Sequence, residues 1–221
     1  MRHFEEQLDE LRKRLLEMGG LVESAIHRSV QALIEKNEEL ARQVQRGESR
    51  INQMEIEIDD LATGLLALEQ PVASDLRFIT AAIKINNDLE RMGDKAVNIA
   101  ERAVALMPES QVTPLVDIPH LASLAESMVR KSLDAFVKRD ADLARSVLVS
   151  DDVVDELRDA AFGELINHMQ IDPSVVRQCV DLIFVARSLE RIADHATNIA
   201  EDVLFLVEGI DVRHHHAEAR E

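Results

Sequence analysis

Apolar residues recur at three- and four-residue steps along almost the whole chain, which is the period of an amphipathic α-helix. The first segment carries the clearest stripe, formed by Leu8, Leu11, Leu15, Met18, Val22, Ile26 and Val30. Turn signals and prolines divide the pattern into six predicted helices, at about 4–36, 39–68, 74–106, 120–138, 141–169 and 174–207. The fold is therefore predicted to be all-α.

Glycine, serine and proline refine these predicted elements. Gly19 and Gly20 interrupt the first stripe and are expected to allow a bend, and Ser74 is expected to cap the third helix. Three of the five prolines fall between residues 107 and 120, which predicts a linker there. The predicted organisation is a three-helix bundle over 1–107, a linker over 108–119, a second three-helix bundle over 120–209 and a polar tail over 210–221, which includes a run of three histidines.

The two predicted bundles are related in sequence. The segment LERMGDKAVNIAE at 89–101 returns as LERIADHATNIAE at 189–201, with nine identities in thirteen ungapped positions. Helices two and five match more loosely, with 150–154 opposite 47–51. We therefore expect two tandem copies of one three-helix unit.

The charge balance narrows the classes of function. The net charge is −17, split as −7 through residue 110 and −10 beyond it, so neither half has the basic character of a nucleic-acid-binding module. The single cysteine, Cys179, lies in an apolar helical stretch and is expected in the core. No apolar run approaches the ~20 residues that span a bilayer. These features predict a cytoplasmic protein that is not inserted in a membrane.

The repeated helix places acidic residues on one stripe. With Glu90 at zero and about 100° per residue, Asp94, Asn98 and Glu101 fall within about 80° of it, nearly opposite the apolar stripe. Its simplest interpretation is a solvated face. Like charges at i,i+4 destabilise a helix, however, and the second copy repeats that spacing. It does so with the residues Glu190, Asp194, Asn198 and Glu201.

Carboxylates and amides are hard oxygen ligands for cations, so the stripes are candidate metal sites. Neighbouring helices offer further ligands, namely Glu48, Glu55, Asp151, Asp152 and Asp155. His195 lies off the stripe and is expected at the surface. The chain contains no Glu-x-x-His di-iron motif, paired-cysteine zinc motif or glycine-rich phosphate loop, and it is not expected to be an enzyme.

These motifs resemble those of the PhoU family, whose members are duplicated three-helix bundles with a Glu/Asp-x-x-x-Asp signature on the third helix of each half. The segment EQPVASDLRFITAAIKI and the opening MRHFEEQLDELRKRLLEMGGLVESAI are similar to the family as well. The resemblance covers residues 3 to 209. It implies a negative regulator of phosphate uptake and of the phosphate-starvation response, linking a Pst-type ABC transporter to a PhoR-type sensor kinase.

The resemblance also implies a homodimer and a multinuclear iron or zinc cluster on the acidic motifs. The implied metal ligands are Glu90, Asp94, Asn98, Glu101, Asp152, Asp155, Glu190, Asp194, Asn198 and Glu201. Asn52 stands where the second half has Asp155, which favours the second half if only one site binds metal. Two other functions stay open, a metal-binding or storage protein and a phosphate-related enzyme or protein that binds phosphate itself. The net charge disfavours direct phosphate capture without a bridging cation.

Overall fold

Six long α-helices make up the computed structural model, which describes residues 2–108 and 117–209. They are α1 (Arg2–Glu35), α2 (Glu38–Glu69), α3 (Ala73–Leu106), α4 (Ile118–Lys138), α5 (Ala141–Ile171) and α6 (Val176–Glu208), with a short 3₁₀ turn at Pro173–Val175. The described ranges contain no strand, so the all-α prediction is confirmed. The polar tail and most of the predicted linker lie outside the described residues.

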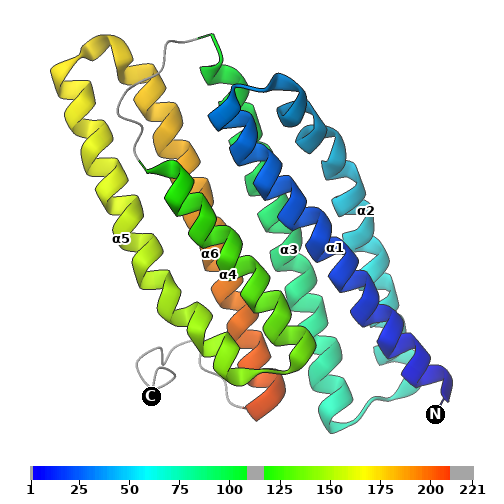
Figure 1. The fold of residues 1–221 in the computed structure, drawn as a ribbon. Helices are drawn as coiled ribbons and strands as arrows, with labels where there is room; N and C mark the ends of the chain where they lie inside the picture. The colour runs from blue at the N-terminus through cyan, green and yellow to red at the C-terminus, as the bar shows by residue number, and fades with distance from the viewer. Residues whose placement is uncertain (1, 109–116, 210–221) are drawn as a thin grey trace.

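Equivalent tight turns join the first two helices of each half. Lys36 and Arg139 adopt left-handed backbone conformations, with φ of 52° and 51°. The next residues, Asn37 and Asp140, cap α2 and α5 by accepting hydrogen bonds from backbone N–H groups of the first turn. The chain therefore reverses direction within two residues, and the consecutive helices are antiparallel neighbours (Figure 1).

Helix α1 is continuous through Gly19, where a Cβ atom would lie 2.7 Å from Cδ1 of Leu133, so this glycine permits close packing of α1 on α4. Two local predictions were wrong. Ser74 lies inside α3, whose N-cap is Val72 with no side-chain capping bond. Pro119 belongs to the first turn of α4, where the missing N–H costs nothing, and not to the linker.

The two halves pack side by side and not end to end. Helices α1, α2 and α3 contact one another, as do α4, α5 and α6, and the halves meet where α3 packs on α6 and α1 packs on α4 (Figure 1). The α3–α6 and α1–α4 pairs both run antiparallel (Figure 1).

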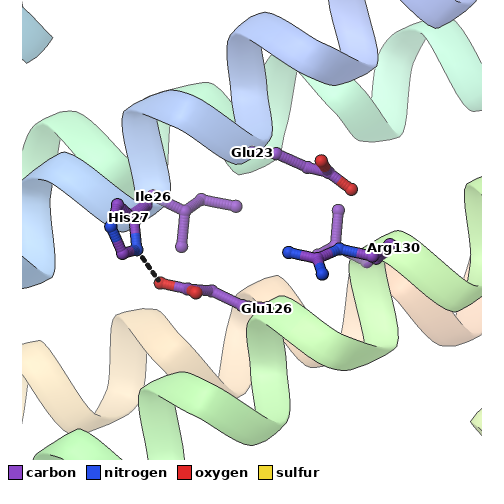
Figure 2. A pocket seen from close by; sticks show the side chains of 6 residues that line it. Glu23, Ile26, His27, Glu126 and Arg130 are labelled. Atoms are coloured by element: carbon purple, nitrogen blue, oxygen red, sulfur yellow. Dashed lines mark ion pairs between the residues drawn. The ribbon is translucent and has the colours of Figure 1, made fainter.

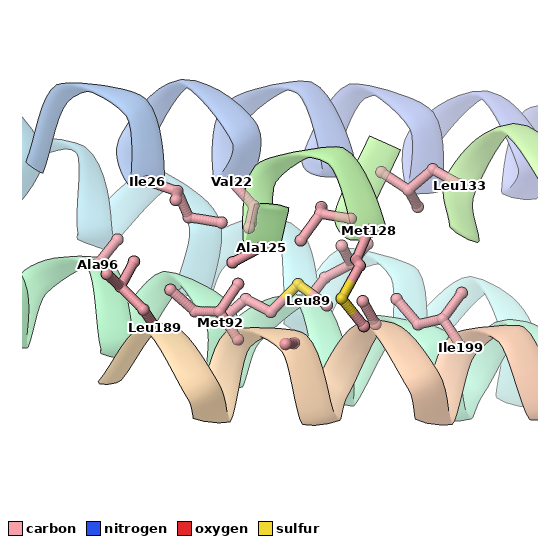
Figure 3. Close-up of a cluster of buried hydrophobic side chains, with 14 of the residues drawn as sticks. Val22, Ile26, Leu89, Met92, Ala96, Ala125, Met128, Leu133, Leu189 and Ile199 are labelled. Atoms are coloured by element: carbon pink, nitrogen blue, oxygen red, sulfur yellow. The ribbon is translucent and has the colours of Figure 1, made fainter. Parts of the chain in front are cut away.

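One hydrophobic core runs through both halves. Val22 of α1, Leu89 of α3, Met128 of α4 and Leu189 of α6 are each fully buried and belong to one cluster (Figure 3). Cys179 is also fully buried, as predicted. Because the buried apolar surface is continuous, the sequence repeats form one folding unit rather than two independent ones.

Polar contacts along the α3–α6 seam follow the same approximate two-fold relation as the sequence. Lys84 donates to Asp202 at 2.6 Å, and the positions 100 residues away, Phe184 and Arg102, are also in contact, with the guanidinium carbon 4.8 Å from the ring centroid. Arg102 pairs in addition with the buried Asp181 at 3.0 Å. The seam that positions the two acidic motifs is therefore fixed by charged as well as apolar contacts.

Candidate functional site

The acidic motif of the first half lies where α2 packs against α3. Glu90 and Asp94 of α3 face Glu48 and Glu55 of α2, and no described Lys, Arg or His side chain forms an ion pair with any of the four. We call these four residues the first acidic site. They were named as ligands from the sequence, and the structure brings them together.

Burial, and after it mutual repulsion, raises the pKa values of two carboxyl groups in the first acidic site. The pKa of Glu90 is raised, mainly by burial and then by the charges of Asp94 and Glu55, with Arg91 opposing the rise. The pKa of Glu55 is raised by burial and by Asp59 and Asp94. Removing the ionised forms from water and placing them beside like charges both disfavour ionisation. A cation bound here would relieve that repulsion.

An arginine occupies the corresponding place in the second half. Arg158 of α5 donates to Glu190 at 2.8 Å and also pairs with Asp155 at 3.3 Å and Asp159 at 2.9 Å. These carboxylates raise the pKa of Arg158 although burial lowers it. Arg191 pairs with Asp194 at 3.0 Å. We call Asp155, Arg158, Glu190 and Asp194 the second acidic site.

Burial is also the largest influence on the pKa values of the carboxyl groups Glu190 and Asp194 in the second acidic site. The side chain of Glu190 is only 12% exposed, and its pKa is raised by burial and by Asp194, against the lowering effects of Arg191 and Arg158. The pKa of Asp194 is likewise raised by burial, with Arg191 lowering it. The Arg158 guanidinium is shared among three carboxylates, so it does not offset the full cost of burying Glu190.

The remaining predicted ligands are dispersed. Asn98, Glu101, Asn198 and Asp152 are exposed, as expected for a solvated stripe. Glu201 is 6% exposed and therefore contradicts the prediction that every carboxylate of the stripe points outward. Packing at the α3–α6 seam, which the helical angle alone does not report, buries this side chain.

His195 also departs from its prediction, because it is not a surface residue. Its side chain is 11% exposed, and Nδ1 lies 2.8 Å from Oδ1 of Asp88 across the seam. Asn198 donates to the same Asp88 oxygen at 3.2 Å. These residues line a groove of about 400 Å³ between α3 and α6, together with Lys84 and Asp202. The groove joins the two halves and contains groups of both signs.

A smaller pocket lies on the other contact between the halves (Figure 2). It has a volume of about 190 Å³ and is lined by Glu23 and His27 of α1 and by Glu126 and Arg130 of α4, above the buried Ile26 and Val129. His27 lies 3.4 Å from Glu126, and Glu23 faces Arg130. These contacts connect α1 to α4 on this side of the molecule, with Arg130 as the permanent cation of the pocket.

The two acidic sites differ in how well their side chains are suited to bind a cation. Within residues 2–108 and 117–209, no three His, Cys, Asp or Glu side chains are arranged so that they could hold a metal ion. The first acidic site has suitable oxygen ligands, but they do not converge on one point. In the second acidic site, the guanidinium of Arg158 lies among the carboxylates. The structure thus weighs against the expected preference for the second half. Arg158 follows Asp155 by one helical turn, a signal present in the sequence but overlooked.

The chain belongs to the PhoU family. The sequence model of the PhoU domain matches it twice, at residues 15–103 and 118–203. The "Phosphate-specific transport system accessory protein PhoU homolog" of Pseudomonas aeruginosa is 45% identical over 212 residues, which cover 96% of this chain and 88% of that protein. The protein of the same name from Aquifex aeolicus is 41% identical, covering 95% of both chains.

Solved structures of the family have the same architecture. The crystal structure of PhoU from Pseudomonas aeruginosa matches with a TM-score of 0.92 and 44% identity, covering 94% of this chain and all of that one. The phosphate transport system regulatory protein PhoU from Streptococcus pneumoniae matches with a TM-score of 0.88 and 31% identity, covering 95% and 99%. The resemblance seen in the sequence motifs is therefore confirmed along nearly the whole chain.

No helix in the described part of the chain is suited to span a membrane. Each one is too short in its apolar stretch, or too interrupted by charged residues, to cross a bilayer.

Proposed function

We propose that this chain is an accessory protein of a phosphate-specific transport system and acts as a cytoplasmic negative regulator of phosphate uptake. It would hold the phosphate-starvation response off by contacting the transporter's ATPase subunit and a PhoR-type histidine kinase, and it would act as a homodimer. The observation that carries this proposal is the match along the full chain to relatives named for phosphate transport.

The surface chemistry of the molecule supports a role in binding partners. Exposed large apolar side chains such as Ile56, Val149 and Val153 lie among charged residues on the described helices. Surfaces that combine apolar and charged groups in this way are suited to protein–protein contacts. The one cysteine is fully buried with a pKa raised by burial, which makes it a poor nucleophile.

Deletion of the gene tests the proposal in the cell. With phosphate plentiful, the deletion strain is expected to express alkaline phosphatase as if it were starved, and the chain supplied on a plasmid is expected to restore repression. Repression that persists in the deletion strain would overturn the proposed negative regulation. A matched plasmid carrying only residues 1–107 should fail to restore repression, because the core is shared between the halves.

Metal binding is a second candidate function, supported by the unpaired carboxylates of the first acidic site. We propose that Glu48, Glu55, Glu90 and Asp94 bind iron or zinc, with the carboxylates neutralising the metal charge. The second acidic site would bind more weakly, since Arg158 competes for the same oxygens.

Calorimetric titration with Fe²⁺ or Zn²⁺ tests this second candidate. Glu90→Gln with Asp94→Asn is expected to lower affinity by more than about tenfold, since two charged ligands are lost. The matched variant Glu190→Gln with Asp194→Asn is expected to change it little. If the second pair of substitutions abolishes binding and the first does not, the sequence-based preference for the second half is restored.

A further inference from the structure

A buried amide joins α3 to α2 beside the first acidic site. Asn86 of α3 is only 1% exposed, and its Nδ2 donates to the backbone oxygen of Glu55 at 2.9 Å and to Oδ1 of Asp59 at 3.1 Å. Both acceptors belong to α2. Glu90 follows Asn86 by four residues, about 40° around the same face of α3. The amide therefore fixes the backbone of one member of the first acidic site one helical turn away from another member.

This amide lowers stability in a way that an apolar side chain would avoid. Oδ1 of Asn86 is buried and accepts no hydrogen bond from any described residue, so it loses its bonds to water without replacement. At the equivalent positions, 100 and 103 residues further on, the second half has Ala186 in the core and Phe162 packed against it, in place of Asn86 and Asp59. The three-helix unit thus folds with apolar residues at this place, and the scaffold itself does not require the amide.

The two halves hold their second and third helices together in different ways. In the second half, Arg158 ties α5 to α6 through its 2.8 Å hydrogen bond to Glu190. In the first half the equivalent residue is Glu55, whose carboxylate repels that of Glu90 on α3. The hydrogen bonds of Asn86 oppose this repulsion, and one of them acts on Glu55 itself through its backbone carbonyl.

We infer that Asn86 is a positioning residue of the first acidic site, which holds α2 on α3 so that Glu55 faces Glu90 despite their like charges. Asn86 acts through the backbone of α2 and need not touch a bound cation. Residues that orient metal ligands through hydrogen bonds change metal affinity by about 10- to 100-fold when they are substituted. The use of this position in metal binding rests on the proposed function, whereas the holding of the two helices is testable without metal.

Calorimetric titration of the full chain with Zn²⁺ tests the positioning role. Asn86→Ala introduces the residue that the second half has, and it is expected to raise Kd at least about tenfold although every proposed ligand is kept. Val154→Ala is the matched control, because it removes fully buried atoms from α5 and lowers stability away from α2 and α3. Its Kd should equal that of the parent chain, and circular dichroism verifies that both variants are folded. Equal weakening in the two variants, or an unchanged Kd in Asn86→Ala, would overturn the role.

A double-mutant cycle without metal tests the same role independently. Asn86→Ala removes the hydrogen bonds but lets α2 and α3 move apart, so relief of repulsion offsets part of the loss in stability. In a Glu55→Gln background less repulsion is left to relieve, while the backbone carbonyl that accepts from Asn86 is kept. Asn86→Ala should therefore lower the urea midpoint at pH 7 by more in that background than in the parent chain. Equal shifts in the two backgrounds would count against the positioning role.

The two experiments separate failure of this inference from failure of the proposed metal binding. If the parent chain does not bind Zn²⁺, the second candidate function fails, and the double-mutant cycle alone decides whether Asn86 holds the carboxylates together. If the parent chain binds Zn²⁺ and Asn86→Ala binds it equally well, the metal-binding function stands and the positioning role is overturned.

Discussion

The two acidic sites occupy equivalent places in the two halves, yet one is open and the other is closed by an arginine. In the first half, Glu55 of α2 faces Glu90 and Asp94, and none of these three carboxylates forms an ion pair with a described residue, although the charge of Arg91 acts on Glu90. In the second half the equivalent of Glu55 is Arg158, which binds Glu190 at 2.8 Å. The exchange of Glu55 for Arg158 therefore puts a cation into the second site where the first has a further carboxylate.

A duplicated protein can keep a structural role in one copy and a binding role in the other, and the two acidic sites differ in this way. The second acidic site contributes structure, because its arginine ties α5 to α6 through Glu190 while Asp155 and Asp159 of α5 pair with the same guanidinium. The first acidic site keeps its like charges together at a cost in stability. Retained repulsion of that kind is expected where a ligand or partner supplies the missing positive charge.

The largest predicted effect comes from breaking the second acidic site. Arg158→Met leaves the largely buried Glu190 with only the longer 3.7 Å pairing to Arg191, and the free energy of unfolding at pH 7 is expected to fall by about 2 kcal/mol. Urea denaturation followed by circular dichroism measures it. The matched change in the first half, Glu55→Met, removes repulsion and should leave stability unchanged or slightly higher. Equal losses in the two variants would show that the sites are energetically alike.

A medium effect is predicted where the halves differ in packing. A Cβ atom at Gly93 would lie 3.2 Å from Cδ1 of Ile51, whereas the second half has Ala193 opposite the smaller Val154. Gly93→Ala and Ile51→Val should each cost about 1 kcal/mol or less, because crowding offsets the gain in helix propensity in the first variant.

The combination of these two substitutions copies the second half's pair and gives the sharper measurement. The double variant should be more stable than the sum of the single effects predicts, with a favourable coupling of at least about 0.5 kcal/mol. A double-mutant cycle from urea denaturation measures the coupling. Strictly additive effects of the two substitutions on stability would mean that Ile51 and Gly93 do not influence each other's packing.

The smallest predicted effect concerns the pH dependence of the first acidic site. The folded-state pKa of Glu90 lies above its unfolded value, so the folded protein binds more protons between the two values and its stability falls as pH rises through that window. Glu90→Gln removes the penalty and should gain about 0.5 kcal/mol at pH 7, discounted for partial exposure.

The gain from Glu90→Gln should disappear once the pH falls below the unfolded-state pKa of about 4.3, because the parent carboxyl is then protonated in both states. Thermal or urea unfolding at neutral and at acidic pH measures the difference between the two proteins. A gain that is the same at both pH values would show that shape, and not charge, is responsible.

The sequence by itself determined the helices, the duplication and the acidic motifs of this PhoU-family protein, because these depend on local periodicity and on identity between segments. Helical angles placed Glu90 and Asp94 on one face, where like charges at i,i+4 repel each other. Glu48 and Glu55 of the second helix were named correctly as their neighbours.

Only the tertiary structure decided how the copies interact. The fully buried Leu89 and Leu189 belong to one cluster, so the core is shared and not divided between two domains. Packing at the α3–α6 seam buries Glu201 and draws His195 to Asp88, against the surface positions expected of both. Long-range contacts between helices more than 100 residues apart leave no trace in local periodicity. The difference between the open and the closed acidic site comes from a nearer contact, in which Arg158 reaches Glu190 only 32 residues away, and it too depends on how neighbouring helices pack.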